Sequence, residues 1–82
     1  MQDEPSLGRL RWRCRRGMKE LDVVLERWLA QSYPTADAGR REVFQRLLDE
    51  QDPQLVAWLF GQERPADRDV AALVEEIASG GG

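Results

Sequence analysis

Apolar side chains recur every three or four residues along most of this 82-residue chain, and no segment alternates apolar and polar residues over strand length. Such a repeat places the apolar side chains on one face of an α-helix. Four stripes of this kind are clear: Leu7, Leu10 and Cys14; Met18, Leu21, Leu25, Trp28 and Leu29; Val43, Phe44, Leu47 and Leu48; and Val70, Leu73, Val74 and Ile77. The pattern predicts an all-α protein.

Capping and helix-breaking residues indicate where three of these helices begin or end. The second helix should end before Tyr33-Pro34, because the residue before a proline avoids the helical conformation. Asp37 and Asp67 are the expected N-caps of the third and the last helix, since a short carboxylate accepts hydrogen bonds from the first free N–H groups of a helix.

A further short helix is expected in the segment DPQLVAWLFG. Asp52 should cap this helix and Pro53 should take its first position, where the missing N–H of proline costs nothing. Gly61 should end it in the left-handed conformation. Because the segment is apolar on nearly every side, we expect it to lie buried.

The chain length fits one small domain, a bundle of about five short helices. We expect a flexible N-terminus over residues 1–6, a helical domain over residues 7–78 and a disordered, glycine-rich tail over residues 79–82. The three tryptophans and two phenylalanines are predicted to belong to the core, because most fall on or beside the apolar stripes.

The residue inventory argues against catalysis by this chain alone. Histidine, the commonest general base, is absent, and one cysteine without histidine leaves too few ligands for a zinc site. Cys14 is expected on the inner face as an inert apolar side chain, although neighbouring arginines could activate an exposed thiol. The pairs Asp49-Glu50 and Glu75-Glu76 are expected to face solvent. We therefore expect neither an enzyme nor a metal protein.

The sequence also carries expectations about location. No apolar run approaches the roughly 20 residues needed to cross a bilayer. The segment MQDEPS has neither the apolar core of a secretory signal nor the composition of a transit peptide. We expect a protein of the bacterial cytoplasm that does not insert into the membrane.

Basic side chains gather near the N-terminus, although the net charge is −3. Residues 1–41 carry 9 basic and 6 acidic side chains, and residues 42–82 carry 3 and 9. The run RLRWRCRR could bind nucleic acid, with Trp12 stacked on a base. The net negative charge of the chain argues against this, and the position of Trp12 beside the apolar stripe favours packing in the core. No nucleic acid is therefore expected as a partner. A small nucleic-acid-binding or antitoxin-like regulatory protein is the alternative.

Another candidate surface lies opposite the apolar stripe of the second helix, where Val23 points outward. If the helix extended back past Gly17, four residues would form one outward strip: Arg16, Glu20, Val23 and Arg27. A glycine costs a helix about 1 kcal/mol relative to alanine. The strip fits a solvated face with one exposed valine as well as a small docking surface, and the pattern alone does not decide.

The stretch RWRCRRGMKELD, followed about thirty residues later by DPQLVAWLFGQERPAD, resembles the small succinate dehydrogenase assembly factors, the flavinylation factors of bacteria and mitochondria. The motif of that family is Arg-Gly-x-x-Glu, which Arg16, Gly17 and Glu20 match, with a following Leu-Asp that Leu21 and Asp22 match. The resemblance covers essentially the whole expected helical domain.

What the resemblance implies is a five-helix, non-catalytic protein that binds the flavoprotein subunit of succinate dehydrogenase, and in some bacteria that of fumarate reductase. Such factors promote the covalent attachment of FAD to a histidine of that subunit. The FAD therefore belongs to the partner, and no cofactor is expected to be bound stably by this chain.

The resemblance also implies a partner-binding site around the motif. Arg16, Gly17 and Glu20 carry over as its centre. Four residues that match neighbouring family positions and one residue of the outward strip complete the expected site: Arg9, Arg15, Met18, Asp22 and Val23. We expect the side chains of Arg16 and Glu20 to bond across the interface, and Gly17 to be small because the partner must approach closely.

Overall fold

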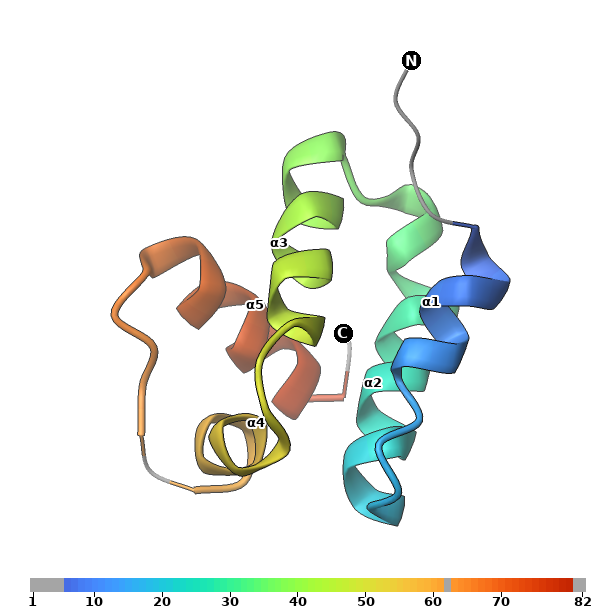
Figure 1. Ribbon diagram of the computed structural model, residues 1–82. Coiled ribbons are helices and arrows are strands. Elements are labelled where there is room, and N and C mark those ends of the chain that lie inside the picture. The colour runs from blue at the N-terminus through green and yellow to red at the C-terminus, as the bar shows by residue number, and fades with distance from the viewer. Residues whose placement is uncertain (1–5, 62, 81–82) are drawn as a thin grey trace.

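The computed structural model describes residues 6–61 and 63–80, and five α-helices and one short 3-10 helix make up most of that part of the chain (Figure 1). They are α1 (Leu7–Arg13), α2 (Lys19–Gln31), η1 (Tyr33–Thr35), α3 (Ala38–Leu48), α4 (Asp52–Leu59) and α5 (Arg68–Ala78). The described ranges contain no strand, so the all-α prediction is confirmed. Most of the expected flexible N-terminus and the last two residues of the expected tail lie outside the described residues.

Helix α5 holds the bundle together, because it packs against α2, α3 and α4. Helices α1 and α2 run side by side along one side of the molecule (Figure 1). Helix α1 makes its main contacts with α2 alone, so one face of α1 is held against the bundle and the rest is open to solvent.

The centre of the core is an aromatic cluster where η1 and helices α2 and α3 meet. Trp28 stacks on Phe44 with ring centres 4.7 Å apart, and Tyr33 meets both rings edge-on. Aromatic pairs of this kind add about 0.5–1.5 kcal/mol each beyond the burial of their area. The indole N–H of Trp28 donates to Glu76 Oε2 at 3.0 Å, and Arg40 forms an ion pair with the same carboxylate. The expectation of a solvated Glu76 was therefore wrong.

The predicted caps are confirmed at two helices. The carboxylate of Asp37 accepts from the N–H of Arg40 at 2.9 Å, and that of Asp67 accepts from the N–H groups of Asp69 and Val70. Each cap satisfies backbone donors that have no partner within the helix.

The expectations at both ends of α4 need correction. Gln51 is the N-cap, so Asp52 is the first helical residue and Pro53 the second, and the side chain of Asp52 bonds elsewhere. Gly61 does not adopt a positive φ; among the described glycines only Gly17 and Gly80 do. A glycine is needed at position 61 for a different reason, because a Cβ there would lie 2.7 Å from the carbonyl oxygen of Ala57.

Besides Met18, which precedes α2 and is 42% exposed, three apolar side chains predicted to be inside face solvent. Phe60 follows α4 and is 47% exposed, since α4 buries only the face that carries Leu55 and Leu59. Trp12 is 68% exposed, because it follows the buried Leu10 by two residues and so lies about 200° around α1. Leu7, in the first turn of α1, is about half exposed.

Candidate protein-binding site

The connection between α1 and α2, residues 14–18, carries the centre of the motif. It begins at Cys14, whose N–H donates to the carbonyl oxygens of Leu10 and Arg11 at the end of α1. The side chain of Cys14 is fully buried, and this burial raises the pKa of its thiol to about 12. The thiol is therefore protonated at neutral pH, in agreement with the expected inert, inner position.

Gly17 turns the chain with a φ of +84°, a conformation that L-residues with a side chain rarely adopt. Apart from the two chain neighbours of Gly17, no atom of the described residues lies within 4 Å of the position that a Cβ would occupy there. The backbone conformation thus favours glycine by itself, and the space beside Gly17 is open to the outside.

The side chain of Arg16 points into the protein and is only 13% exposed. Its Nε donates to Asp52 Oδ1 at 2.9 Å, and its terminal nitrogens donate to the backbone carbonyls of Arg13, Leu48 and Glu50 at 3.1, 3.0 and 2.5 Å. The guanidinium therefore satisfies carbonyl groups at the ends of α1 and α3 and pairs with the first residue of α4. One side chain links three helices at the motif.

The expected outward strip is consequently wrong for Arg16, because the helix does not extend back past Gly17 and α2 begins at Lys19. The backbone N–H of Arg16 donates to Asp22 Oδ1 at 2.7 Å, so Asp22 also holds the connection in place. Arg27 is half-buried, and its Nε is buried without a hydrogen-bond partner.

Glu20 and Val23 do face outward. Glu20 is exposed and its carboxylate makes no hydrogen bond or ion pair within the described ranges, and Val23 is 51% exposed. Glu20 also lines a hollow of about 500 Å³ that opens between the start of α2 and the end of α4. Its lining residues are Met18, Lys19, Glu20, Leu21, Val56 and Phe60.

We define the motif surface as four residues that line this hollow, the exposed Met18, Glu20 and Phe60 and the half-buried Val56, together with the exposed Gly17 and Val23 of the same segment. Sequence reasoning missed Val56 and Phe60. The signal that could have found them is the composition of the fourth helix, whose apolar residues cover more than the one face that a small bundle can bury.

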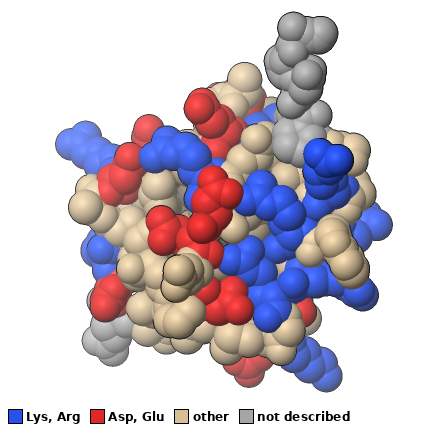
Figure 2. Space-filling view, viewed as in Figure 1, with Lys and Arg blue, Asp and Glu red and all other residues tan. Residues whose placement is uncertain are grey.

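Arg9 and Arg15, the other two expected site residues, are both exposed, Arg9 in the first turn of α1 and Arg15 in the connection that follows this helix. The guanidinium of Arg15 lies over the ring of Trp12, 5.6 Å from the ring centre. Figure 2 shows blue basic atoms gathered over the side of the molecule where Figure 1 places α1, while red acidic atoms lie mainly over the centre and the opposite side. The motif surface thus adjoins a positively charged face.

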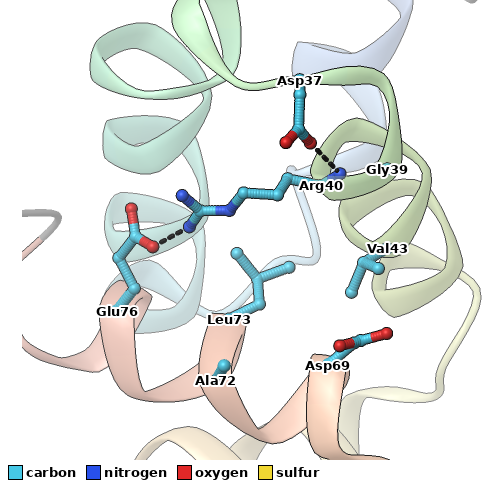
Figure 3. Close-up of a pocket in the computed structure, with 8 residues that line it drawn as sticks. All are labelled: Asp37, Gly39, Arg40, Val43, Asp69, Ala72, Leu73 and Glu76. Carbon is cyan, nitrogen blue, oxygen red and sulfur yellow. Dashed lines mark hydrogen bonds and ion pairs between the residues drawn. The ribbon is translucent and has the colours of Figure 1, made fainter.

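A second hollow of about 520 Å³ lies between the start of α3 and α5 (Figure 3). Val43, Ala72 and Leu73 supply its apolar lining, and the Arg40–Glu76 ion pair crosses one side of it. No residue of the motif lines this hollow. Its carboxylates are largely occupied with capping α3 and holding α5 to the aromatic core.

The described part of the chain also lacks two features that would bear on the site. No helix there is long and apolar enough to cross a membrane. No group of three or more histidine, cysteine, aspartate or glutamate side chains in that part could hold a metal ion.

Comparison with known proteins matches residues 8–80 to the family described as flavinator of succinate dehydrogenase. The relatives named FAD assembly factor SdhE include proteins of Methylococcus capsulatus, 49% identical over 70 residues, and Xylella fastidiosa, 46% identical over 76 residues. These alignments cover 85% and 92% of this chain and 84% and 78% of the two relatives. The relative from Coxiella burnetii is 38% identical over 77 residues, 94% of both chains.

Proposed function

The chain belongs to the family of flavinators of succinate dehydrogenase, and on this basis we propose that it is an assembly factor that binds the flavoprotein subunit of succinate dehydrogenase and promotes its covalent flavinylation with FAD. The proposal extends to the flavoprotein of fumarate reductase as a second client. The relatives named above come from bacteria, and we place the activity in the bacterial cytoplasm.

The observation that carries the proposal is the composition of the motif surface. Glu20 has no internal partner in the described ranges, the space beside Gly17 is open, and an apolar hollow lies next to both. An unpaired charge at the edge of exposed apolar groups is the arrangement expected of a protein-binding surface, where the partner supplies the missing bond.

Within the proposal Arg16 has a different role from the one first expected. Its guanidinium is occupied by Asp52 and three carbonyl groups, so it fixes the shape of the connection. Glu20 and Gly17 then present the surface, and Met18 and Val23 provide apolar contact. Asp22 supports the same connection from α2 through its bond to the N–H of Arg16.

We propose that this chain acts without catalysis. The FAD and its acceptor histidine belong to the partner, and this chain contributes a binding surface. A bound protein shifts an equilibrium only through its different affinity for the two states. The factor would therefore bind the conformation of the flavoprotein in which histidine and flavin are held in reacting geometry, which lowers the entropic part of the barrier.

The proposal is tested in a respiring bacterium that lacks its own factor. The chain is expressed with an affinity tag, captured proteins are identified, and covalent flavin on the flavoprotein is measured by fluorescence after denaturing electrophoresis. We expect the flavoprotein subunit among the captured proteins and covalent flavin only when the chain is present. Absence of the flavoprotein from the captured proteins would overturn the proposal.

A further inference from the structure

The outer face of α1 presents an exposed tryptophan in a setting of unpaired arginines. Trp12 is 68% exposed, the largest exposed fraction among the exposed large apolar side chains of the described chain. The guanidinium of Arg15 lies over its ring. We call Arg9, Arg11, Trp12 and Arg15 the α1 outer face.

The arginines of this face differ from the other arginines nearby. Arg13 forms an ion pair with Asp49, and Arg16 pairs with Asp52. Arg9, Arg11 and Arg15 are exposed and form no ion pair within the part of the chain that the structure describes. Their charges are thus available to a partner.

The position of Trp12 explains why its ring is largely uncovered by the residues that the structure describes. Leu10 and Cys14 are the buried residues of this segment, and Trp12 lies between them in sequence but on the opposite side of the helix. Helix α1 packs mainly on α2, so no other helix reaches the exposed ring. The chain therefore leaves a large, rigid aromatic side chain in solvent at the end of α1.

We propose that the α1 outer face is a second part of the contact with the flavoprotein subunit, and that Trp12 fits an apolar pocket of that subunit bordered by carboxylates. This inference rests on the proposed function. Tryptophan and arginine are the residue types that most often dominate the energy of protein interfaces. The face is continuous with the motif, because Arg15 directly precedes Arg16 and Gly17.

The distribution of charge also favours an acidic protein surface as the occupant. The side of the molecule where Figure 1 places α1, and with it Trp12 and the start of the motif, is the more basic one in Figure 2, whereas residues 42–82 carry 3 basic and 9 acidic side chains. An acidic patch on the flavoprotein would attract this basic side, which orients the encounter. Nucleic acid and anionic lipid also attract tryptophan and arginine, and both are outcomes of the test below.

The first experiment measures the affinity for purified flavoprotein that holds FAD noncovalently. We expect Trp12→Ala to weaken binding about tenfold or more, as for a buried interface tryptophan, and Trp12→Phe to recover part of the loss. The variants should fold as the parent does, by circular dichroism, because the ring is exposed. The double variant Arg11→Glu, Arg15→Glu should slow association and weaken its salt dependence.

The matched control is Arg68→Glu, a charge reversal at an exposed arginine on α5 that forms no ion pair within the described chain. Its affinity should stay within about twofold of the parent. A photo-crosslinking amino acid at position 12, compared with one at position 68, should link to the flavoprotein from position 12 alone.

Unchanged affinity of Trp12→Ala, or an absence of crosslinks from position 12, would overturn the inference while leaving the proposed function intact if the parent still binds. Binding of the parent to single-stranded RNA or to anionic phosphatidylglycerol vesicles that requires Trp12, with flavoprotein binding unaffected, would overturn it as well. Failure of the parent itself to bind the flavoprotein would instead contradict the proposed function.

Discussion

At the scale of single residues, Gly17 combines a backbone requirement with an open position. With φ at +84°, an L-residue with a side chain costs about 1–2 kcal/mol at this position, although its Cβ would clash with no atom of the described residues beyond its two chain neighbours. Gly17→Arg should therefore lower the stability of the protein by about that amount. The variant should keep the helical circular dichroism of the parent and no longer promote flavinylation of the flavoprotein. The effect of backbone strain can be separated from the effect of filling the open space beside Gly17. Asparagine serves this purpose, since it tolerates the left-handed conformation better than other residues with a Cβ.

Gly17→Asn should be nearly as stable as the parent in urea unfolding. Its affinity for the flavoprotein should nevertheless be lower than that of the parent, because the asparagine side chain fills the open space. Gly17→Ala is the companion variant, with more backbone strain and a smaller side chain. If Gly17→Asn binds and flavinylates as the parent does, then close approach at this residue is not required and only the turn matters.

Arg16 carries a prediction about stability. Its guanidinium bonds one carboxylate and three carbonyls, so Arg16→Gln should lower the free energy of unfolding by about 2 kcal/mol or more, measured by urea denaturation. Arg16→Lys should restore little, because an ammonium cannot reproduce the planar fork. Asp52→Asn keeps an acceptor and should cost less.

The opposite pattern would show that Arg16 meets the partner directly. In that case Arg16→Gln would unfold at the same urea concentration as the parent and yet lose affinity for the flavoprotein. The affinity of Asp52→Asn for the flavoprotein is the check on this alternative. This substitution weakens the bond between Arg16 and residue 52 but leaves the arginine in place, so a direct contact of Arg16 with the partner would be kept.

At the scale of helices, the cap of α5 makes stability depend on pH. The N–H groups of Val70 and Asp69, with Arg46, stabilise the ionised carboxylate and hold the pKa of Asp67 below its usual range. A carboxyl whose pKa is lowered by folding stabilises the protein above its unfolded pKa and loses that contribution as the pH falls through its folded value.

Asp67→Asn should therefore have a lower Tm than the parent at neutral pH, and the difference should shrink as the pH falls below about 4. Thermal unfolding between about pH 7 and pH 2 checks this expectation. Asp69→Asn is the control, because it removes a carboxylate from the same turn and keeps the cap. A Tm difference that stays constant down to the lowest pH would contradict the assignment.

Sequence predicted most of the helices because their cause is local. Apolar spacing and the caps Asp37 and Asp67 determine where α3 and α5 lie, and both are readable without knowing the neighbours. The wrong predictions concern residues whose burial depends on tertiary packing. Trp12 was placed beside a stripe that it opposes, and Phe60 was assigned to a core that covers only one face of α4.

At the scale of the whole molecule, the candidate site is assembled from segments far apart in sequence. Gly17 and Glu20 were found through the motif, but Phe60 reaches the same hollow only because α4 returns to the start of α2. The inward turn of Arg16 likewise depends on the ends of α1, α3 and α4 meeting at one point. The spacing of residues along the chain predicts neither the position of Phe60 at the hollow nor the inward direction of Arg16.

The most direct measurement reconstitutes flavinylation from purified flavoprotein, FAD and this chain, and follows covalent flavin with time. The parent and Glu42→Gln, a control at an exposed glutamate outside the motif surface, should both accelerate covalent attachment, and Glu20→Gln should lose most of that effect. Covalent flavin that forms equally fast without the chain, or equally fast with Glu20→Gln, would contradict the account.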